Sequence, residues 1–474
     1  MIRPARTPTV CIGRAAVGGG LYVPMELGDE FRVASSVIAK LNPEHRAWER
    51  RKRAGGFVGD EPPSKYVCAG IVPEGPHAGS FWLPRHSPVA CRNLTDATTL
   101  PPAERITLRT ELRPYQSAAL DAWSFEQSGT IVAPCGAGKT TLGTGAIAAV
   151  CTPALVLVHT LALADQWSQR CMDQLGITPG RIGGGVHWTT GEHPRVVVAT
   201  VQTLAQWSWS ERWDFGSKFG LVVLDEAHHA PARTFAETFA SLPARYRLGL
   251  TATPTRADGL EDLLWWSCGP AVYRIAQKDL EEGGYTLRPR VTWVSTGFSP
   301  SVSSEEWAKL TDELAADPDR NALVAATAAQ RLSEGRSVLV LADRTAHCAV
   351  LAEQIGAWGQ PAEALTGSLT KKARVDVLER LTDGRLRCAV ATSLADEGLD
   401  VPGLDVVVLA SPSRNEGRVQ QRVGRALRPH ASKAQPEVVD FVDAFPMARN
   451  AAKSRFRLYR HLGWGPAPVP GSPS

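Results

Sequence analysis

Residues 133–141, with the sequence APCGAGKTT, combine the residue types that can hold the phosphates of a nucleotide. Glycines at 136 and 138 allow backbone N–H groups to turn toward phosphate oxygens, and a helix that follows them would add partial positive charge. The Lys139 ammonium group can reach the β- and γ-phosphates, and the Thr140 hydroxyl can bind Mg²⁺. The loop residues that we predict to bind ATP are Pro134, Gly136, Ala137, Gly138, Lys139, Thr140 and Thr141.

The segments beside this loop have the character that a phosphate-binding loop requires. An apolar run at 130–132 precedes it, and a helix-compatible run at 142–150 follows it. Strand, glycine loop and helix in this order form the structural context of the motif. A glycine-rich turn without a ligand is the alternative, but Gly-Lys-Thr in the correct register argues against it.

A second polar group, Asp225-Glu226-Ala227-His228, follows the apolar run at 221–224. A carboxylate at the end of a buried strand can face the phosphate loop across the carboxyl edge of the sheet. Asp225 would then hold Mg²⁺, and Glu226 would orient or deprotonate the attacking water. Acidic pairs also cap helices, but a position downstream of a phosphate loop favours catalysis. His228 either relays between domains or is an ordinary loop histidine.

A third group lies in residues 420–428, QQRVGRALR. On a helix, Gln421, Arg425 and Arg428 would share one face, because they occupy positions i, i+4 and i+7. Arginines on such a face can stabilise the charge that develops on a transferred phosphoryl group. We predict that these three residues are catalytic together with Lys139. A basic surface helix is the alternative.

Other polar residues extend the predicted site. Four residues outside the loop are predicted to bind the nucleotide: Arg113, Gln116, Gly398 and Asp400. The amide of Gln116 can donate to and accept from an adenine at once, while Gly398 and Asp400 belong to a polar turn at 391–400 that can face the ribose. In the segment 248–254, LGLTATP, the hydroxyls of Thr251 and Thr253 can link the ATP site to bound nucleic acid.

The elements that must position these residues form two α/β series. Continuous apolar runs that alternate with helical stretches predict parallel sheets covered on both faces. The first series has strands at 154–158, 195–200 and 221–224; the second has strands at 337–341, 388–391 and 406–409, with helices at 320–333, 346–358 and 371–383.

Composition narrows the class of protein. The chain has 474 residues, of which 43% are hydrophobic and 21% charged, as in a globular protein of two to four domains. Nine scattered cysteines argue against a zinc site or a disulfide framework and fit a reducing cytoplasm. The net charge of +4 is compatible with a polyanionic partner. We expect no secretory signal and no membrane span.

The two ends differ from the α/β series. The pattern of residues 1–106 indicates a small α+β domain. Its basic run at 50–53 either contacts nucleic acid phosphates or lies on a solvated helix face. The fold is expected to end after Val442. A basic, helical tail would follow, and the Pro/Gly/Ser-rich residues 465–474 would be disordered.

Taken in order, these motifs resemble those of superfamily 2 helicases and translocases over residues 107–445. The resemblance implies two RecA-like domains around an ATP cleft and Mg-ATP hydrolysis coupled to movement along one nucleic acid strand. It also implies nucleic acid contacts from Thr160, Thr200 and Thr366.

Within the superfamily, the segments 163–167 (LADQW) and 248–259 (LGLTATPTRADG) are similar to the xeroderma pigmentosum group B-type branch and related phage and bacterial helicases. That branch has Arg-Glu-Asp where this chain has Arg256-Ala257-Asp258, so one carboxylate is missing. We still predict that Arg256 contacts nucleic acid. Residues 1–106 would correspond to a small DNA-recognition domain.

The resulting division is an accessory domain at 1–106, RecA-like domains at 107–275 and 285–445, and a basic, Pro-rich tail at 446–474. We expect an ATP-dependent DNA helicase or translocase, acting in repair, recombination or replication, with ATP and Mg²⁺ as cofactors. An RNA helicase or a duplex translocase of the restriction type is the first alternative. An ATP-gated nucleic-acid-binding scaffold is the second.

Overall fold

The computed structural model describes the chain from residue 10 to residue 465, apart from 19, 39, 42–44, 46–47, 50–51, 54–60, 62–64, 67–68, 103–104, 188–194, 226–231, 253–261, 302–306, 393–400, 402, 414–415, 425–428 and 431–434. Its contacts divide the chain into two compact units. Unit 1 comprises residues 1–133 and 138–275, and unit 2 comprises residues 134–137 and 276–474.

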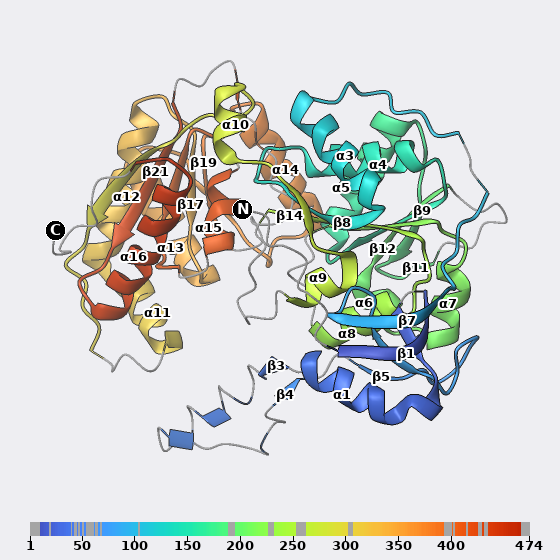
Figure 1. Ribbon diagram of the computed structural model, residues 1–474. Helices are drawn as coiled ribbons and strands as arrows, with labels where there is room; N and C mark the ends of the chain where they lie inside the picture. The colour runs from blue at the N-terminus through green and yellow to red at the C-terminus, as the bar shows by residue number, and fades with distance from the viewer. Residues whose placement is uncertain are drawn as a thin grey trace. The chain divides into compact units, whose positions relative to one another are not determined.

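Unit 1 is built around a sheet with the strand order β11-β10-β12-β9-β13-β14-β8-β15 (Figure 1). Its strands pair in parallel, apart from the antiparallel pair of β10 and β11. The strands are β8 (Ser128–Val132), β9 (Ala154–Val158), β10 (Gly180–Gly183), β11 (Val186–His187), β12 (Val196–Thr200), β13 (Leu221–Asp225), β14 (Tyr246–Thr251) and β15 (Ala271–Arg274). The predicted parallel sheet is therefore confirmed.

Helices cover both faces of this sheet, as its continuous apolar strands require. Every residue of β8, β9, β12 and β13 is buried. In Figure 1, α3, α4 and α5 lie on one face, and α6, α8 and α9 lie on the other. The helices of unit 1 are α1 (Gly28–Ile38), α3 (Pro114–Glu126), α4 (Lys139–Val150), α5 (Leu161–Leu175), α6 (Val201–Leu204), α7 (Trp209–Gly216), α8 (Ala232–Ala240) and α9 (Asp262–Cys268), with the 3-10 helix η1 (Met25–Leu27).

A second sheet of unit 1 is formed by the N-terminal residues and has the order β5-β6-β2-β1-β7. Its strands are β1 (Val10–Val17), β2 (Gly20–Val23), β5 (Gly70–Ile71), β6 (Phe81–Pro84) and β7 (Val89–Asp96). Between β2 and β5 in the chain, β3 (Lys40–Leu41) and β4 (Lys65–Tyr66) form a separate two-stranded sheet. Helix α1 packs on one face of this sheet, and α8 and α9 pack on the other (Figure 1). Unit 1 is thus a stack of alternating helical and sheet layers.

The N-terminal sheet shares one hydrophobic core with the α/β part of unit 1. This core joins Tyr22, Trp82 and Leu83 of the N-terminal sheet to Trp213 and Trp266 of the α/β part. Hydrogen bonds cross the same boundary, because the Tyr22 hydroxyl donates to the Ala240 carbonyl at 2.6 Å. The expected α+β character of residues 1–106 is therefore correct for the described residues, and this region is part of unit 1.

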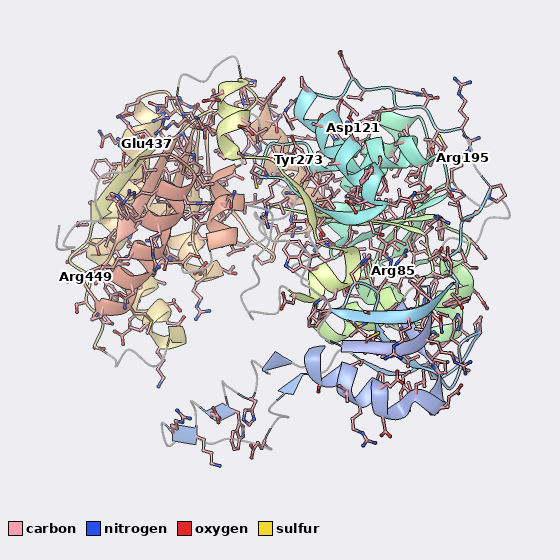
Figure 2. The ribbon with its side chains drawn as sticks, in the orientation of Figure 1. Arg85, Asp121, Arg195, Tyr273, Glu437 and Arg449 are labelled. Atoms are coloured by element: carbon pink, nitrogen blue, oxygen red, sulfur yellow. The ribbon has the colours of Figure 1, made fainter. Side chains whose placement is uncertain are left out.

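A buried arginine, Arg247, forms hydrogen bonds at the ends of α8 and α9, the helices that pack on the N-terminal sheet. Arg247, on β14, is fully buried and donates to the carbonyls of Phe239, Leu242 and Ser267 at 2.7–2.9 Å. These carbonyls lie at or just beyond the C-terminal ends of α8 and α9, where helices carry partial negative charge. Burial lowers the pKa of Arg247 to about 9. Arg85, labelled in Figure 2, donates to the Ala244 carbonyl at 2.9 Å in the same region.

Unit 2 contains a parallel sheet with the order β16-β21-β20-β17-β19-β18. The strands are β16 (Arg290–Ser295), β17 (Val338–Leu341), β18 (Glu363–Leu365), β19 (Cys388–Ala391), β20 (Val406–Leu409) and β21 (Glu437–Val442); the helices are α10 (Gln277–Glu282), α11 (Trp307–Ala316), α12 (Pro318–Ser333), α13 (Thr345–Ala357), α14 (Lys371–Thr382), α15 (Glu416–Gly424) and α16 (Pro446–His461). The predicted strands at 388–391 and 406–409 are confirmed, and the three predicted helices match α12, α13 and α14 within two residues at either end.

The expectation that the fold ends after Val442 is wrong. Helix α16 packs on the sheet of unit 2, and its Tyr459 and Leu458 belong to the core together with Trp464. Arg455 is buried and forms hydrogen bonds at 2.7 and 2.8 Å with the Asp440 carboxylate. The predicted basic helix is present as α16, but the spacing of its residues places one arginine and the apolar side chains on the inner face of the helix.

A fully buried carboxylate, Glu437, anchors the start of β21 (Figure 2). It accepts hydrogen bonds from Arg331, Arg336 and Thr292, and Arg290 lies 3.2 Å away. Burial alone would raise the pKa of Glu437, but these hydrogen bonds and positive charges outweigh it and lower the pKa to about 2. The cluster ties α12, β16 and the segment before β17 to one strand.

The shared core of unit 1 predicts that Trp82→Ala destabilises the whole unit. Trp82 is 4% exposed and packs against Trp209, with ring centroids 6.0 Å apart. We expect a loss of about 3–5 kcal/mol in the free energy of unfolding, measured by urea denaturation with circular dichroism. Leu94→Ala, at a position 54% exposed on β7, is the control and should change stability by less than about 0.5 kcal/mol. Equal stability of the two variants would contradict a shared core.

The Glu437 cluster predicts a loss of stability in acid. Because its folded-state pKa of about 2 lies below the ordinary glutamate value of 4.5, ionised Glu437 contributes stability above about pH 4.5 that is lost as the pH falls toward 2. The contribution is on the order of 3 kcal/mol. Urea midpoints measured between pH 3 and pH 7 should show a shallower pH dependence for Glu437→Gln than for the wild-type protein. Parallel profiles would exclude this carboxylate as a source of the acid sensitivity.

Candidate functional site

The phosphate loop has the backbone geometry that its glycines predict. Gly136 and Gly138 have φ angles of +86° and +77°, which residues with a Cβ rarely adopt. Helix α4 begins at Lys139, directly after Gly138, and the Leu142 N–H donates to the Gly138 carbonyl at 3.0 Å. The predicted sequence of strand, loop and helix is confirmed by β8 and α4.

Gln116 lies against this loop and is almost fully buried, with 2% of its surface exposed. Its Oε1 accepts a hydrogen bond from the Arg113 backbone N–H at 3.0 Å, at the start of α3. A Cβ at Gly138 would lie 2.6 Å from Gln116 Nε2, so the glycine leaves the space that the amide occupies. The Arg113 guanidinium donates to the Tyr115 hydroxyl at 2.9 Å. Adenine recognition by Gln116 and Arg113 stays a prediction. The structure shows in addition that the Gln116 side chain packs against the phosphate loop at Gly138.

The sheet order brings the loop beside two other predicted site residues. Strand β14 lies between β8, which leads into the loop, and β13, which ends at Asp225. In these pairs Thr251 is opposite Val132, and Asp225 is opposite Leu250. The Ala133 N–H also donates to the Thr251 carbonyl at 2.8 Å. Thr251 and Asp225 therefore lie at the same carboxyl edge as the phosphate loop.

Asp225 is held in a defined orientation. It is 4% exposed, and its Oδ2 accepts a hydrogen bond from the Trp167 indole N–H at 2.8 Å. Thr140, partly exposed, follows Lys139 in the first turn of α4. A buried carboxylate and a hydroxyl at one sheet edge are hard oxygen ligands of the kind that Mg²⁺ uses, so the donor set fits that ion. Their role as metal ligands stays a prediction.

Sequence reasoning missed the contribution of helix α5. Gln174 Nε2 donates to the Thr141 hydroxyl at 3.1 Å, and the Thr144 hydroxyl donates to Gln174 Oε1 at 2.7 Å. Gln174 is 6% exposed, so the amide is an internal link between α4 and α5. The helical spacing of the apolar residues of α5 could have shown its buried face, but it could not have shown the partners.

Further along the same edge lie two residues predicted to contact nucleic acid. Thr160 caps α5 and accepts from the Leu163 N–H at 3.3 Å. Thr200 ends β12, is 5% exposed, and shares a 2.7 Å hydrogen bond with the Thr203 hydroxyl. Three glycines at 183–185 with positive φ angles pass close by, since a Cβ at Gly183 would lie 2.8 Å from Thr200 Oγ1. Sequence reasoning missed this loop, although the run IGGGV was visible.

In unit 2, Thr366 follows β18 and is 4% exposed. Its hydroxyl shares a 2.8 Å hydrogen bond with the Ser368 hydroxyl, which lies on an exposed residue. Predicted residues outside the described part of the chain are Glu226, His228, Thr253, Arg256, Gly398, Asp400, Arg425 and Arg428. Gln421 lies on α15, and its side chain is not described.

Two protein-family models match the chain. The model for the res subunit of type III restriction enzymes matches residues 109–256, and the helicase conserved C-terminal domain matches residues 320–430. These matches, together with the sheet order and the phosphate loop, show that the chain belongs to the superfamily 2 helicases, which are ATP-dependent enzymes.

Within that superfamily the chain is similar to XPB-type proteins. It is 29% identical over 360 residues to a DNA 3'-5' translocase XPB2 of Sulfurisphaera tokodaii, covering 67% of this chain and 79% of the relative. It is also 29% identical over 367 residues to a DNA 3'-5' helicase XPB of Kineococcus radiotolerans, covering 74% of this chain and 63% of the relative. The chain thus spans less than two thirds of the second protein.

Solved structures show the same fold. An ATP-dependent type ISP restriction-modification enzyme, LlaBIII bound to DNA, matches with a TM-score of 0.60 at 15% identity, covering 78% of this chain and 32% of that one. Two tandem RecA-like domains, the predicted fold class, are therefore confirmed. Among the helices that the structure describes, none has the length and apolar character needed to cross a membrane.

The loop geometry predicts that Gly138→Ala abolishes tight nucleotide binding. The new methyl group would combine a φ of +77° with a Cβ 2.6 Å from Gln116 Nε2, which strains the loop and displaces the amide. We expect affinity for an ATP analogue to fall at least about tenfold, equivalent to 1.4 kcal/mol, by isothermal titration calorimetry.

Gly79→Ala is the matched control for this substitution. Gly79 has a φ of +78°, but its Cβ would meet nothing within 4 Å. The control therefore carries the same backbone strain without the clash and should bind the analogue normally. Normal binding by Gly138→Ala would contradict the geometry assigned to the loop.

Proposed function

We propose that this protein is a motor that uses ATP hydrolysis to move along or remodel DNA. The observation that carries the proposal is the shared carboxyl edge of the unit 1 sheet. Along that edge the phosphate loop, Asp225 and Thr251 are followed by Thr160 and Thr200. A nucleotide site and a row of hydroxyl residues on one rigid edge allow the two ligands to influence each other.

The proposed reaction is hydrolysis of the β–γ phosphate bond of ATP. Lys139 and the loop N–H groups would hold the phosphates, while Asp225 and Thr140 would hold Mg²⁺. The ion, when bound, neutralises charge on the β- and γ-phosphates. Glu226 orients the attacking water, and Arg425 and Arg428 stabilise the charge that develops on the γ-phosphoryl group. Gln421 is assigned to the same site from its place in the helical pattern.

Movement would follow from the difference in affinity between two states. If the domain at 107–275 holds the phosphates and the domain at 285–445 supplies arginines, ATP favours a closed arrangement and hydrolysis removes that preference. A ligand shifts such an equilibrium only by its differential affinity for the two states. Both units would hold one strand, through Thr160 and Thr200 in unit 1 and Thr366 in unit 2. Contacts of this kind reach the nucleic acid backbone, so movement should depend on salt and little on base sequence.

DNA is the proposed substrate because the relatives named above are described as acting on DNA. Translocation along duplex DNA without strand separation is the second candidate, and three observations favour it. The first family model is that of a restriction enzyme subunit, and the first relative is called a translocase. The sequence Arg256-Ala257-Asp258 lacks one carboxylate of the related helicases, which also fits a reduced role in opening duplexes.

The proposal predicts an ATPase that nucleic acid stimulates. Turnover should rise at least about tenfold with its preferred DNA and little with RNA of the same length, measured by phosphate release. Lys139→Ala should abolish binding or turnover. Glu226→Gln should bind ATP normally but lose turnover by about 10²-fold or more, as expected for loss of a general base.

Strand-displacement and triplex-displacement assays, together with the ATPase assay, distinguish a DNA helicase, a duplex translocase and an RNA helicase. Strand displacement on 3′-tailed DNA supports a helicase, whereas triplex displacement from blunt duplex without strand separation supports a duplex translocase. Greater stimulation by RNA than by any DNA would contradict the proposed substrate. Wild-type turnover in Glu226→Gln would remove that residue from its proposed role.

A further inference from the structure

A side chain of the neighbouring helix α5 contacts the carboxylate of Asp225. Trp167 is fully buried on α5, and its indole N–H donates to Asp225 Oδ2 at 2.8 Å. A carboxylate at the end of a strand would otherwise rotate about its side-chain torsions. The hydrogen bond favours one rotamer, in which Oδ2 is bound to the Trp167 indole.

The chemistry of the donor matters for the ion that Asp225 is proposed to hold. An indole N–H is a donor only and carries no charge. It therefore orients the carboxylate while leaving its negative charge available for a divalent cation. An arginine or lysine at this place would supply the same hydrogen bond but would lower the attraction of the site for Mg²⁺. Partners behind a metal ligand commonly tune metal affinity in this way.

The indole is itself held without freedom to move. Its ring lies against Gly143 on α4, where a Cβ would come within 2.2 Å of the ring atom Cη2. Gly143 is buried in the second turn after Lys139. The ring therefore fills the space between the helix that begins at the phosphate loop and the strand that ends at Asp225.

The same face of α5 makes a second contact with the site. Gln174 lies two turns after Trp167, so the two side chains project from one side of the helix. Gln174 donates to the Thr141 hydroxyl at 3.1 Å. One helix thus fixes Thr141 through Gln174 and Asp225 through Trp167, while its first turn is capped by Thr160.

We propose that Trp167 is a positioning residue for nucleotide-bound Mg²⁺, acting through Asp225. This inference rests on the proposed function, because it takes Asp225 as a ligand of the ion. Trp167 does not touch the ion or the nucleotide. Its effect is to hold the carboxylate in one rotamer, at the sheet edge that also carries the phosphate loop.

The test compares Trp167→Phe with Trp123→Phe. Phenylalanine keeps an aromatic ring at each position and removes only the indole N–H group and part of the ring. Trp123 is a matched control because it is fully buried in the same unit and donates to the Arg247 carbonyl at 2.8 Å. Both variants lose one buried hydrogen bond, but only Trp167 is linked to Asp225.

Binding of a non-hydrolysable ATP analogue is measured by isothermal titration calorimetry in Mg²⁺ and in EDTA. Trp167→Phe should bind like the wild-type protein in EDTA and about 10-fold more weakly in Mg²⁺, the lower end of the range for partners behind a metal ligand. Trp123→Phe should match the wild-type protein in both buffers. The Mg²⁺ concentration for half-maximal ATPase should rise by a similar factor in Trp167→Phe alone.

Equal behaviour of the two variants in Mg²⁺ would overturn the inference, as would an equal loss in both buffers for Trp167→Phe. If Trp167→Phe does not fold, Gly143→Ala provides the same test, since its methyl group displaces the indole and leaves every hydrogen-bonding group present. Unchanged Mg²⁺ dependence in folded Gly143→Ala would also overturn it. Absence of DNA stimulation in the wild-type protein speaks instead against the proposed function and leaves this comparison readable.

Discussion

Parallel strand pairing is the constraint on which the candidate site depends. Strands β8, β14, β13, β9 and β12 run in one direction, so their carboxyl ends meet at one edge of the sheet. The strands are buried, apart from Tyr246 at the start of β14, and pair along most of their length, which makes this edge rigid. Polar residues that are separated by more than a hundred positions in the chain are thereby held at fixed places. The loops can vary in sequence while their starting points stay the same.

Much of this arrangement could be predicted from local sequence. The runs at 154–158, 388–391 and 406–409 coincide with strands because continuous aliphatic residues of that length suit strands buried on both faces. The phosphate loop was recognisable because Gly136 and Gly138 stand at positions that require positive φ angles. Residue types and spacing carry this information, so no long-range contact had to be known.

The features that sequence reasoning missed all depend on long-range packing. Trp167 and Gln174 lie on the buried face of α5, and only the structure shows that one contacts Asp225 and the other Thr141. Helix α16 was predicted to lie beyond the fold because of its basic residues, yet Arg455 is buried against Asp440. A buried ion pair of this kind leaves no signal in composition, since its two members occur in separate elements.

The core shared by the N-terminal sheet and the α/β part of unit 1 has a practical consequence. Tyr22 and Trp82 of the N-terminal sheet pack in one cluster with Trp213 of the α/β part. Because β7 belongs to the same N-terminal sheet, its exposed end should move together with the strands that carry Asp225 and the phosphate loop. A fluorophore attached at Asn93, which is exposed on that strand, would follow the rotation of the entire nucleotide-binding unit. Single-molecule polarisation from such a label would report the rotation of unit 1, without contributions from an independently tumbling appendage.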